Sequence, residues 1–174
     1  MAHPDPHCQL AHGIGTPPED GRTLVAVFAS PVAEHLVHFA RHLGFRTILV
    51  DPAAPTDAPW AERVTDTLGP SIVDSTTDVV VTDHDRPELG TVLRDALALP
   101  ARWIGVMGSP RHTGPHVEAL RERGLAEDQI ARVHRPIGLN IGSRTPPEIA
   151  LSALAGLLAD RNARPGGFGF PKPA

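Results

Sequence analysis

Five consecutive residues, from Gly108 to His112, have the composition of a phosphate-binding segment. Ser109 supplies a hydroxyl, Arg111 and His112 supply cationic or hydrogen-bond-donating side chains, and Gly108 lets backbone approach a ligand closely. The segment precedes a predicted helix, where cations are unfavourable unless an anion lies between them and the helix dipole. We therefore expect an anion at this segment, although an ordinary helix start would use the same glycine and serine.

A second glycine-containing segment, 138–145, precedes the clearest helix start in the sequence. Asn140 offers an amide, Arg144 a permanent positive charge and Thr145 a capping hydroxyl. The run Thr145-Pro146-Pro147-Glu148 combines an N-cap hydroxyl, proline in the first turn and a glutamate three residues on. We expect this segment to complete the same anion-binding pocket.

Three further polar residues each follow a predicted strand. Ser30 lies in Ala29-Ser30-Pro31, where a dinucleotide fold carries Gly-x-Gly-x-x-Gly, and it is either part of an anion site or a plain N-cap. Asp51 lies where an acid accepts a ribose hydroxyl in NAD enzymes, or it starts a turn. His84, between two aspartates, is either a proton-transferring group or an ordinary polar residue at a strand end. The glycine-free first turn weakens the prediction of NAD(P) binding.

Two groups of residues have spacing that metal ligands use, but we expect no metal at either. One group lies within a Pro-rich N-terminal segment and consists of His3, His7, Cys8 and His12. In the other, His112 and His116 are four residues apart, but Gly114 and Pro115 interrupt a regular helix between them. A serine hydrolase also lacks support, because the sequence contains no Gly-x-Ser-x-Gly elbow.

Short apolar runs of strand length alternate with helix-period segments between residues 23 and 161. This alternation predicts a three-layer, Rossmann-like α/β domain, doubly wound, with a mainly parallel sheet and helices on both faces. The expected strands are 24–29, 45–50, 78–82 and 103–107, and the expected helices are about 32–43, 61–68, 89–97, 117–124, 128–133 and 146–160. Ligands of such sheets bind beyond the carboxyl ends of the strands, which is where the polar residues above lie.

Length and composition restrict the function classes. The 174 residues fit one domain, 23–161, with flexible tails over 1–22 and 162–174. The single cysteine cannot form an internal disulfide and no apolar run reaches the roughly 18 residues of a membrane span, so we expect a soluble, cytoplasmic protein. A net charge of −4 supplies no general attraction to nucleic acid or anionic membrane.

Two stretches, Trp103–Ser109 and Ala131–Ala150, strongly resemble the C-terminal Rossmann-like half of the XdhC/CoxI family of xanthine dehydrogenase accessory proteins. The resemblance extends more weakly through His84 and Asp51 to the first strand, so that it covers about residues 24–161. Family members usually begin this half with a Gly-Ala-Gly-His-like turn, which is Ala29-Ser30-Pro31 here. Longer members also carry an N-terminal domain with a Gly-Gly-Cys-containing motif.

The resemblance implies an accessory protein, or chaperone, in the maturation of a molybdenum hydroxylase of the xanthine dehydrogenase or CO dehydrogenase type. Such a protein binds molybdenum cofactor (molybdopterin), protects it during sulfuration and transfers it to the apoenzyme. It also implies that the chain works with a separate polypeptide carrying the N-terminal domain, or as a homodimer.

Two other functions stay open. An NAD(P)-dependent oxidoreductase would use Asp51 on the ribose and His84 as general acid or base, but the glycine-free turn and the absence of tyrosine disfavour it. The third is an assembly subunit that binds no cofactor.

Overall fold

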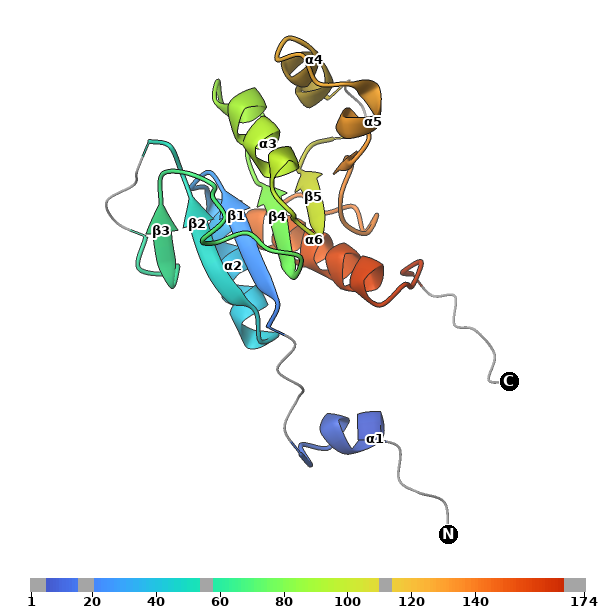
Figure 1. Ribbon diagram of the computed structural model, residues 1–174. Helices are drawn as coiled ribbons and strands as arrows, with labels where there is room; N and C mark the ends of the chain where they lie inside the picture. Colours follow the sequence, from blue (N-terminus) through green and yellow to red (C-terminus); the bar gives the residue numbers. More distant parts are fainter. Residues whose placement is uncertain (1–5, 16–20, 54–57, 110–113, 168–174) are drawn as a thin grey trace.

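A computed structural model describes residues 6–15, 21–53, 58–109 and 114–167, and its six strands form one sheet in the order β3-β2-β1-β4-β5-β6 (Figure 1). Every pair of neighbouring strands is parallel, as predicted. The strands are β1 Thr23–Val27, β2 Arg46–Val50, β3 Arg63–Thr65, β4 Thr77–Val81, β5 Trp103–Val106 and β6 Val133–His134.

The strand order reverses between β1 and β4, and this reversal defines the topological switch point of the sheet. Val27 at the end of β1 lies opposite Val50 of β2 on one side and Val81 of β4 on the other. The carboxyl ends of the three strands are therefore level. Sheets with this order bind ligands in the crevice beyond these ends.

Helices cover both faces of the sheet. On one face α2 (Pro31–His42) packs beside α6 (Pro146–Arg161), and on the other lie α3 (Leu89–Ala98) and α4 (Pro115–Arg121) (Figure 1). Successive side chains of β1 alternate between these layers: Leu24 and Ala26 pack towards α2 and α6, while Val25 and Val27 pack towards α3. The fold is thus the three-layer, Rossmann-like arrangement that the sequence predicts.

Two short helices complete the described elements. The helix α5 (Glu127–Ile130) follows α4, and α1 (Pro6–Ala11) lies in the N-terminal segment, where no helix was predicted. Among the described residues, no helix combines the length and apolar character that crossing a membrane requires.

The ends of α2 and α6 are set by capping residues that can be recognised in the sequence. Ser30 caps α2, because its Oγ accepts the N–H of Ala33 at 3.0 Å, and Gly44 (φ +81°) ends the helix. The helix α6 begins at Pro146, as predicted. Its capping glutamate, Glu148, accepts the N–H of Thr145 at 3.1 Å.

Two predicted helices are wrong in whole or in part. Residues 61–68 were expected to form a helix, but they contain β3, whose backbone extends the free side of β2 by pairing with Ile48 to Val50. The β-branched residues Val64 and Thr65 suit this strand. The helix expected over 128–133 ends at Ile130, after which β6 pairs with β5. In both places the unpaired ladder of a neighbouring strand outweighs a weak local helical pattern.

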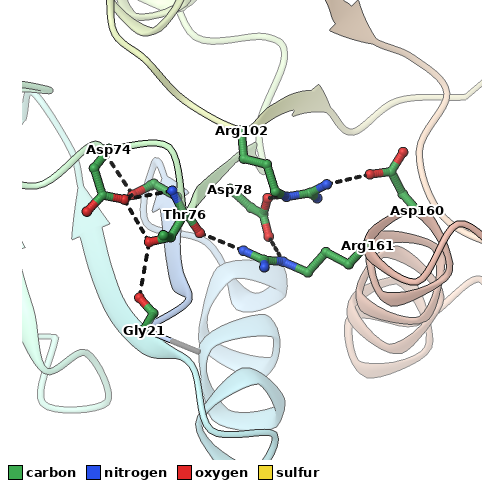
Figure 2. A network of polar contacts seen from close by, with 8 residues as sticks. Gly21, Asp74, Thr76, Asp78, Arg102, Asp160 and Arg161 are labelled. Atoms are coloured by element: carbon green, nitrogen blue, oxygen red, sulfur yellow. Dashed lines mark hydrogen bonds and ion pairs between the residues drawn. The ribbon is translucent and has the colours of Figure 1, made fainter. Parts of the chain in front are cut away.

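An ion-pair network around the buried Asp78 joins three elements at the amino-terminal end of β4 (Figure 2). Asp78 is fully buried, with 0% exposure, and its two carboxylate oxygens accept Arg102 Nε and Arg161 Nε, each at 2.6 Å. Arg102 also donates to Asp160 at 2.7 Å, and Arg161 donates to the carbonyl of Thr76 at 2.6 Å. Burial raises the pKa of Asp78, while the hydrogen bonds from Arg161 and Arg102 oppose that rise. The network ties β5 and α6 to β4 at the edge opposite the switch point.

Candidate functional site

Asp51 lies at the switch point and joins the ends of three segments. Its Oδ2 accepts the N–H of Ala29 at 2.8 Å, and its Oδ1 accepts the N–H of Ala53 at 2.9 Å and Arg86 Nη2 at 3.2 Å. The residue is only 2% exposed. The carboxylate therefore holds the β1–α2 turn from inside the protein, with charge-assisted hydrogen bonds.

Two backbone N–H groups at the β1–α2 turn form hydrogen bonds within the protein. The N–H of Ala29 bonds to Asp51 and that of Ala33 to Ser30 Oγ, while Pro31 has no N–H to offer. Ser30 Oγ also lies 3.1 Å from Thr82 Oγ1, across the switch point. The structure therefore brings Ser30 and Asp51 into one turn. A pyrophosphate there would compete with the protein's own acceptors.

Phe28 occupies the position where this turn leaves β1, and its backbone is strained. Its φ of +71° lies in the left-handed region that favours glycine, and its side chain is fully buried, with 0% exposure. The Thr82 hydroxyl lies 2.8 Å from the carbonyl oxygen of Phe28, which it hydrogen-bonds. Neighbouring side chains thus fix an aromatic residue in a conformation that dinucleotide folds reach with glycine.

Arg86 is a residue of this site that the sequence analysis missed. Its guanidinium lies 3.2 Å from Asp51 Oδ1, 3.4 Å from Glu88 Oε2 and 4.9 Å from the ring centroid of Phe28. Burial lowers the pKa of Arg86, but the charges of Asp51 and Glu88 outweigh this effect and raise it overall. The switch point therefore contains a fixed cation whose side chain is 25% exposed. Arg86 follows β4, as His84 does, and this position after a strand is the sequence feature that could have identified it as a site residue.

His84 lies in the same segment after β4. Its side chain is 34% exposed, and its Nε2 is 3.6 Å from Asp85 Oδ1. The Asp83 carboxylate accepts the N–H of Asp85 at 3.0 Å, which forms a turn around the histidine. His84 is thus accessible at the carboxyl edge, and its role as a ligand-lining residue stays a prediction.

At the end of β5, Gly108 and Ser109 contact a second arginine that the sequence analysis did not select. Arg135 Nη2 donates to the carbonyl of Ser109 at 3.1 Å. A Cβ atom at Gly108 would lie 2.6 Å from Arg135 Nη2, so the glycine leaves the space that the guanidinium occupies. Arg111 and His112, predicted to lie here, fall outside the described residues.

His116 lies close to this cluster and is buried, at 7% exposure. Its Nδ1 has no hydrogen-bond partner within the described part of the chain. Burial, and then the charge of Arg135, lowers its pKa, so the imidazole is held in the neutral form.

The predicted anion-binding loop lies before α6. Asn140, Arg144 and Thr145 are exposed. The backbone N–H groups of Arg144 and Thr145 donate to Glu148, at 2.8 and 3.1 Å, and these bonds lower the pKa of that carboxylate. The helix start is therefore already occupied by a protein carboxylate, and the Arg144 side chain is the accessible cationic group.

The same loop is anchored to the middle of α6. Ser152 Oγ donates to the carbonyl of Leu139 at 2.6 Å, and the N–H of Leu139 donates to the carbonyl of Ser152 at 3.1 Å. A Cβ atom at Gly156 would lie 2.7 Å from the Cα of Gly138, so two glycines allow the loop to touch the helix. The position of the loop is thus set by packing.

Both histidine groups include side chains outside the described part of the chain, those of His3, His7 and Cys8 in one and of His112 in the other, so neither is tested as a metal site. Over the described residues, no three His, Cys, Asp or Glu side chains come together as metal ligands would.

Residues 24–157, from β1 into α6, match the family model of the XdhC Rossmann domain. The chain belongs to this family. A solved structure of a xanthine dehydrogenase from Bacillus halodurans is 25% identical to this XdhC domain, with a TM-score of 0.65 over 82% of this chain and 43% of that one. The uncharacterized protein YqeB of Escherichia coli K12 is 40% identical over 90 residues, which are 52% of this chain and 16% of YqeB.

This XdhC chain therefore matches less than half the length of either relative. The resemblance seen in Trp103–Ser109 and Ala131–Ala150 is confirmed as a family relationship.

Proposed function

We propose that this XdhC domain is an accessory protein of a molybdenum hydroxylase and that it binds molybdenum cofactor or a related nucleotide. The observation that carries the proposal is the family match, which runs through all six strands from β1 into α6. The similarity to a xanthine dehydrogenase structure supports the same class of target enzyme. In sheets of this strand order, ligands bind beyond the carboxyl ends of the strands at the switch point, which is where Ser30 and Arg86 lie here.

In this proposal one group of residues binds the phosphate of the ligand and a second group surrounds the rest of it. The phosphate-bearing end of the ligand is held by residues at the ends of β5 and β6: Gly108, Ser109, Arg111, His112, Asn140, Arg144 and Thr145. Ser30 and His84 would line the ligand site, and the buried Asp51 would support it from below through Ala29 and Arg86. The accessible Arg144 guanidinium fits a phosphate, because its planar fork donates two parallel hydrogen bonds. The cofactor would supply the molybdenum centre that the apoenzyme needs, and the chain would bind and shield it.

An accessory role explains the crevice better than NAD(P)-dependent hydride transfer. Ribose recognition by Asp51 would require an exposed carboxylate, whereas this one is buried and bonded to Ala29, Ala53 and Arg86. The partners in the proposal are the apoenzyme and either a second polypeptide with the family's N-terminal domain or another copy of the chain. Transfer would take place in the cytoplasm.

The test is anaerobic equilibrium binding of released molybdenum cofactor to the full chain, with excess NAD in a parallel sample. Saturable binding that NAD does not displace would support the proposal, whereas NAD binding without cofactor binding would favour the oxidoreductase. Arg144→Ala should weaken cofactor binding by about 1.5–3 kcal/mol, since a charge-assisted hydrogen bond is lost. Arg41→Ala, on the exposed surface of α2 and away from the carboxyl ends of the strands, is the matched control.

A further inference from the structure

A cavity of about 180 Å³ lies beside the crevice, at the carboxyl ends of β2 and β3 and against α3. Its apolar lining includes Val50, Leu68 and Val92, and its polar rim includes Asp66, Glu88 and Thr91. None of the residues selected from the sequence lines it. Pockets for drug-sized ligands measure roughly 300–1,000 Å³, so this cavity has room for one ring system and not for a whole cofactor.

The cavity is connected to the switch point through an ion-pair chain. Glu88, on its rim, lies 3.4 Å from Arg86 Nε, and Arg86 Nη2 lies 3.2 Å from Asp51. From β2 to β5 there are three strand spacings, which is about 14 Å at ~4.8 Å per spacing. A ligand that placed its ring in the cavity and a phosphate near Ser109 would have to extend over that distance. The carboxylates of the cavity would repel the phosphate, so the ligand would bind with its ring in the cavity and its phosphate away from it.

The polar rim has acceptors for N–H groups and a donor for a carbonyl. Asp66 is exposed, and its carboxylate accepts the Thr67 hydroxyl at 3.3 Å, which leaves further acceptor sites free to meet a ligand. The Thr91 oxygen accepts Arg123 Nη2 at 3.3 Å, so its own hydroxyl proton can be donated. A carboxylate accepts two parallel N–H bonds well, and the apolar lining suits the flat faces of a ring.

We propose that this cavity binds a 2-amino-4-oxopyrimidine ring, with Asp66 accepting the exocyclic amine and the adjacent ring N–H, and Thr91 donating to the carbonyl. Pterins and guanine share this edge, whereas adenine has no ring N–H beside its amine. The choice of a pterin rests on the proposed function, because the cavity would then bind the pterin ring of the cofactor. The hydrogen-bonding edge is inferred from Asp66 and Thr91 on the rim of the cavity.

The test measures the binding of 6-hydroxymethylpterin, which carries no phosphate, to the full chain by the fluorescence of the pterin. Guanosine and adenosine are added as competitors. We expect saturable binding that guanosine displaces and adenosine does not. Asp66→Asn should weaken binding at least tenfold, because the amide replaces one acceptor by a donor, while Asp66→Glu should keep most of it. Asp128→Asn, an exposed change on α5, is the matched control and should have no effect.

Tighter binding of guanosine than of the pterin, with the same dependence on Asp66, would support the cavity and identify its ligand as a guanine nucleotide. Three results would overturn the proposal: no binding of either ring, equal competition by adenosine, or unchanged binding in Asp66→Asn. Arg144→Ala separates the two proposals, because it should weaken cofactor binding and leave pterin binding unchanged. Full cofactor binding by Asp66→Asn would refute the cavity and leave the accessory function standing.

Discussion

Asp51 Oδ2 lies 2.8 Å from the backbone nitrogen of Ala29, so a buried carboxylate closes the turn that follows β1. In dinucleotide-binding sheets that turn is built from glycines, and its N–H groups face a pyrophosphate. Here the N–H faces the protein's own anion, and the strained Phe28 replaces glycine. The buried carboxylate therefore stabilises the turn and occupies the Ala29 N–H, which a ligand cannot then use.

Replacing Asp51 by Asn should destabilise the fold by about 1–3 kcal/mol, because an amide places a donor where Asp51 accepts hydrogen bonds, while Arg86 is 25% exposed and keeps Glu88 as a partner. Urea unfolding followed by circular dichroism measures the change. Asp85→Asn, whose side chain is 86% exposed, is the control and should cost little. Normal stability together with lost ligand binding in Asp51→Asn would instead assign the carboxylate to the ligand.

Arg161→Met should also cost about 3–5 kcal/mol, since it leaves the buried Asp78 with one arginine fewer. Because burial raises the folded-state pKa of Asp78, the folded state retains this proton at a higher pH than the unfolded chain. The group's contribution to stability therefore falls as pH rises from the unfolded value of about 3.9 through the folded value. Losing Arg161 raises that pKa further, so stability measured from pH 4 to 8 should decline more in Arg161→Met than in the wild type. A parallel decline in both proteins would contradict the network.

His116→Leu should change how stability depends on pH. Burial and Arg135 lower the folded-state pKa of His116 below 6.5, so the unfolded chain binds the proton more readily. Stability from this group is complete above about pH 6.5 and is lost as the pH falls towards the lowered value. Urea midpoints at pH 7.5 and 5.5 should therefore differ less in His116→Leu than in the wild type. The exposed substitution His38→Gln should leave the wild-type difference unchanged.

Gly156→Ala should destabilise the fold although alanine is the better helix former. The new Cβ would lie 2.7 Å from the Cα of Gly138, and forcing atoms into a packed contact costs roughly 1–3 kcal/mol. Alanine gains about 1 kcal/mol in helix propensity over glycine, which is less than most of the range estimated for the packing cost. Gly69→Ala is the matched control, because nothing lies within 4 Å of its Cβ position. A higher melting temperature for Gly156→Ala would show that the loop is not in contact with α6.

The sequence predicted those parts of the fold that depend on local pattern. Buried parallel strands are continuous apolar runs, and the cap before Pro146 is a local signal, so both were found. The strand β3 was missed because it depends on the free edge of β2, and the role of Arg86 was missed because it depends on a carboxylate 35 positions away. Asp51 was placed at the correct strand end, and its bond to Ala53 is local, but Ala29 and Arg86 are brought to it by tertiary structure. The predicted binding roles of Asn140, Arg144 and Thr145 stay predictions.

The lengths of the strands have a consequence for the behaviour of the protein at high concentration. The two outermost strands are the shortest, with three residues in β3 and two in β6, whereas the four inner strands have four or five. Unpaired strand edges are templates on which another chain can add and begin fibril growth. This sheet offers such a template over only a few residues at either side, and Arg63 adds a charge to one of them. The fold therefore combines a long parallel core with edges that discourage self-association through the backbone.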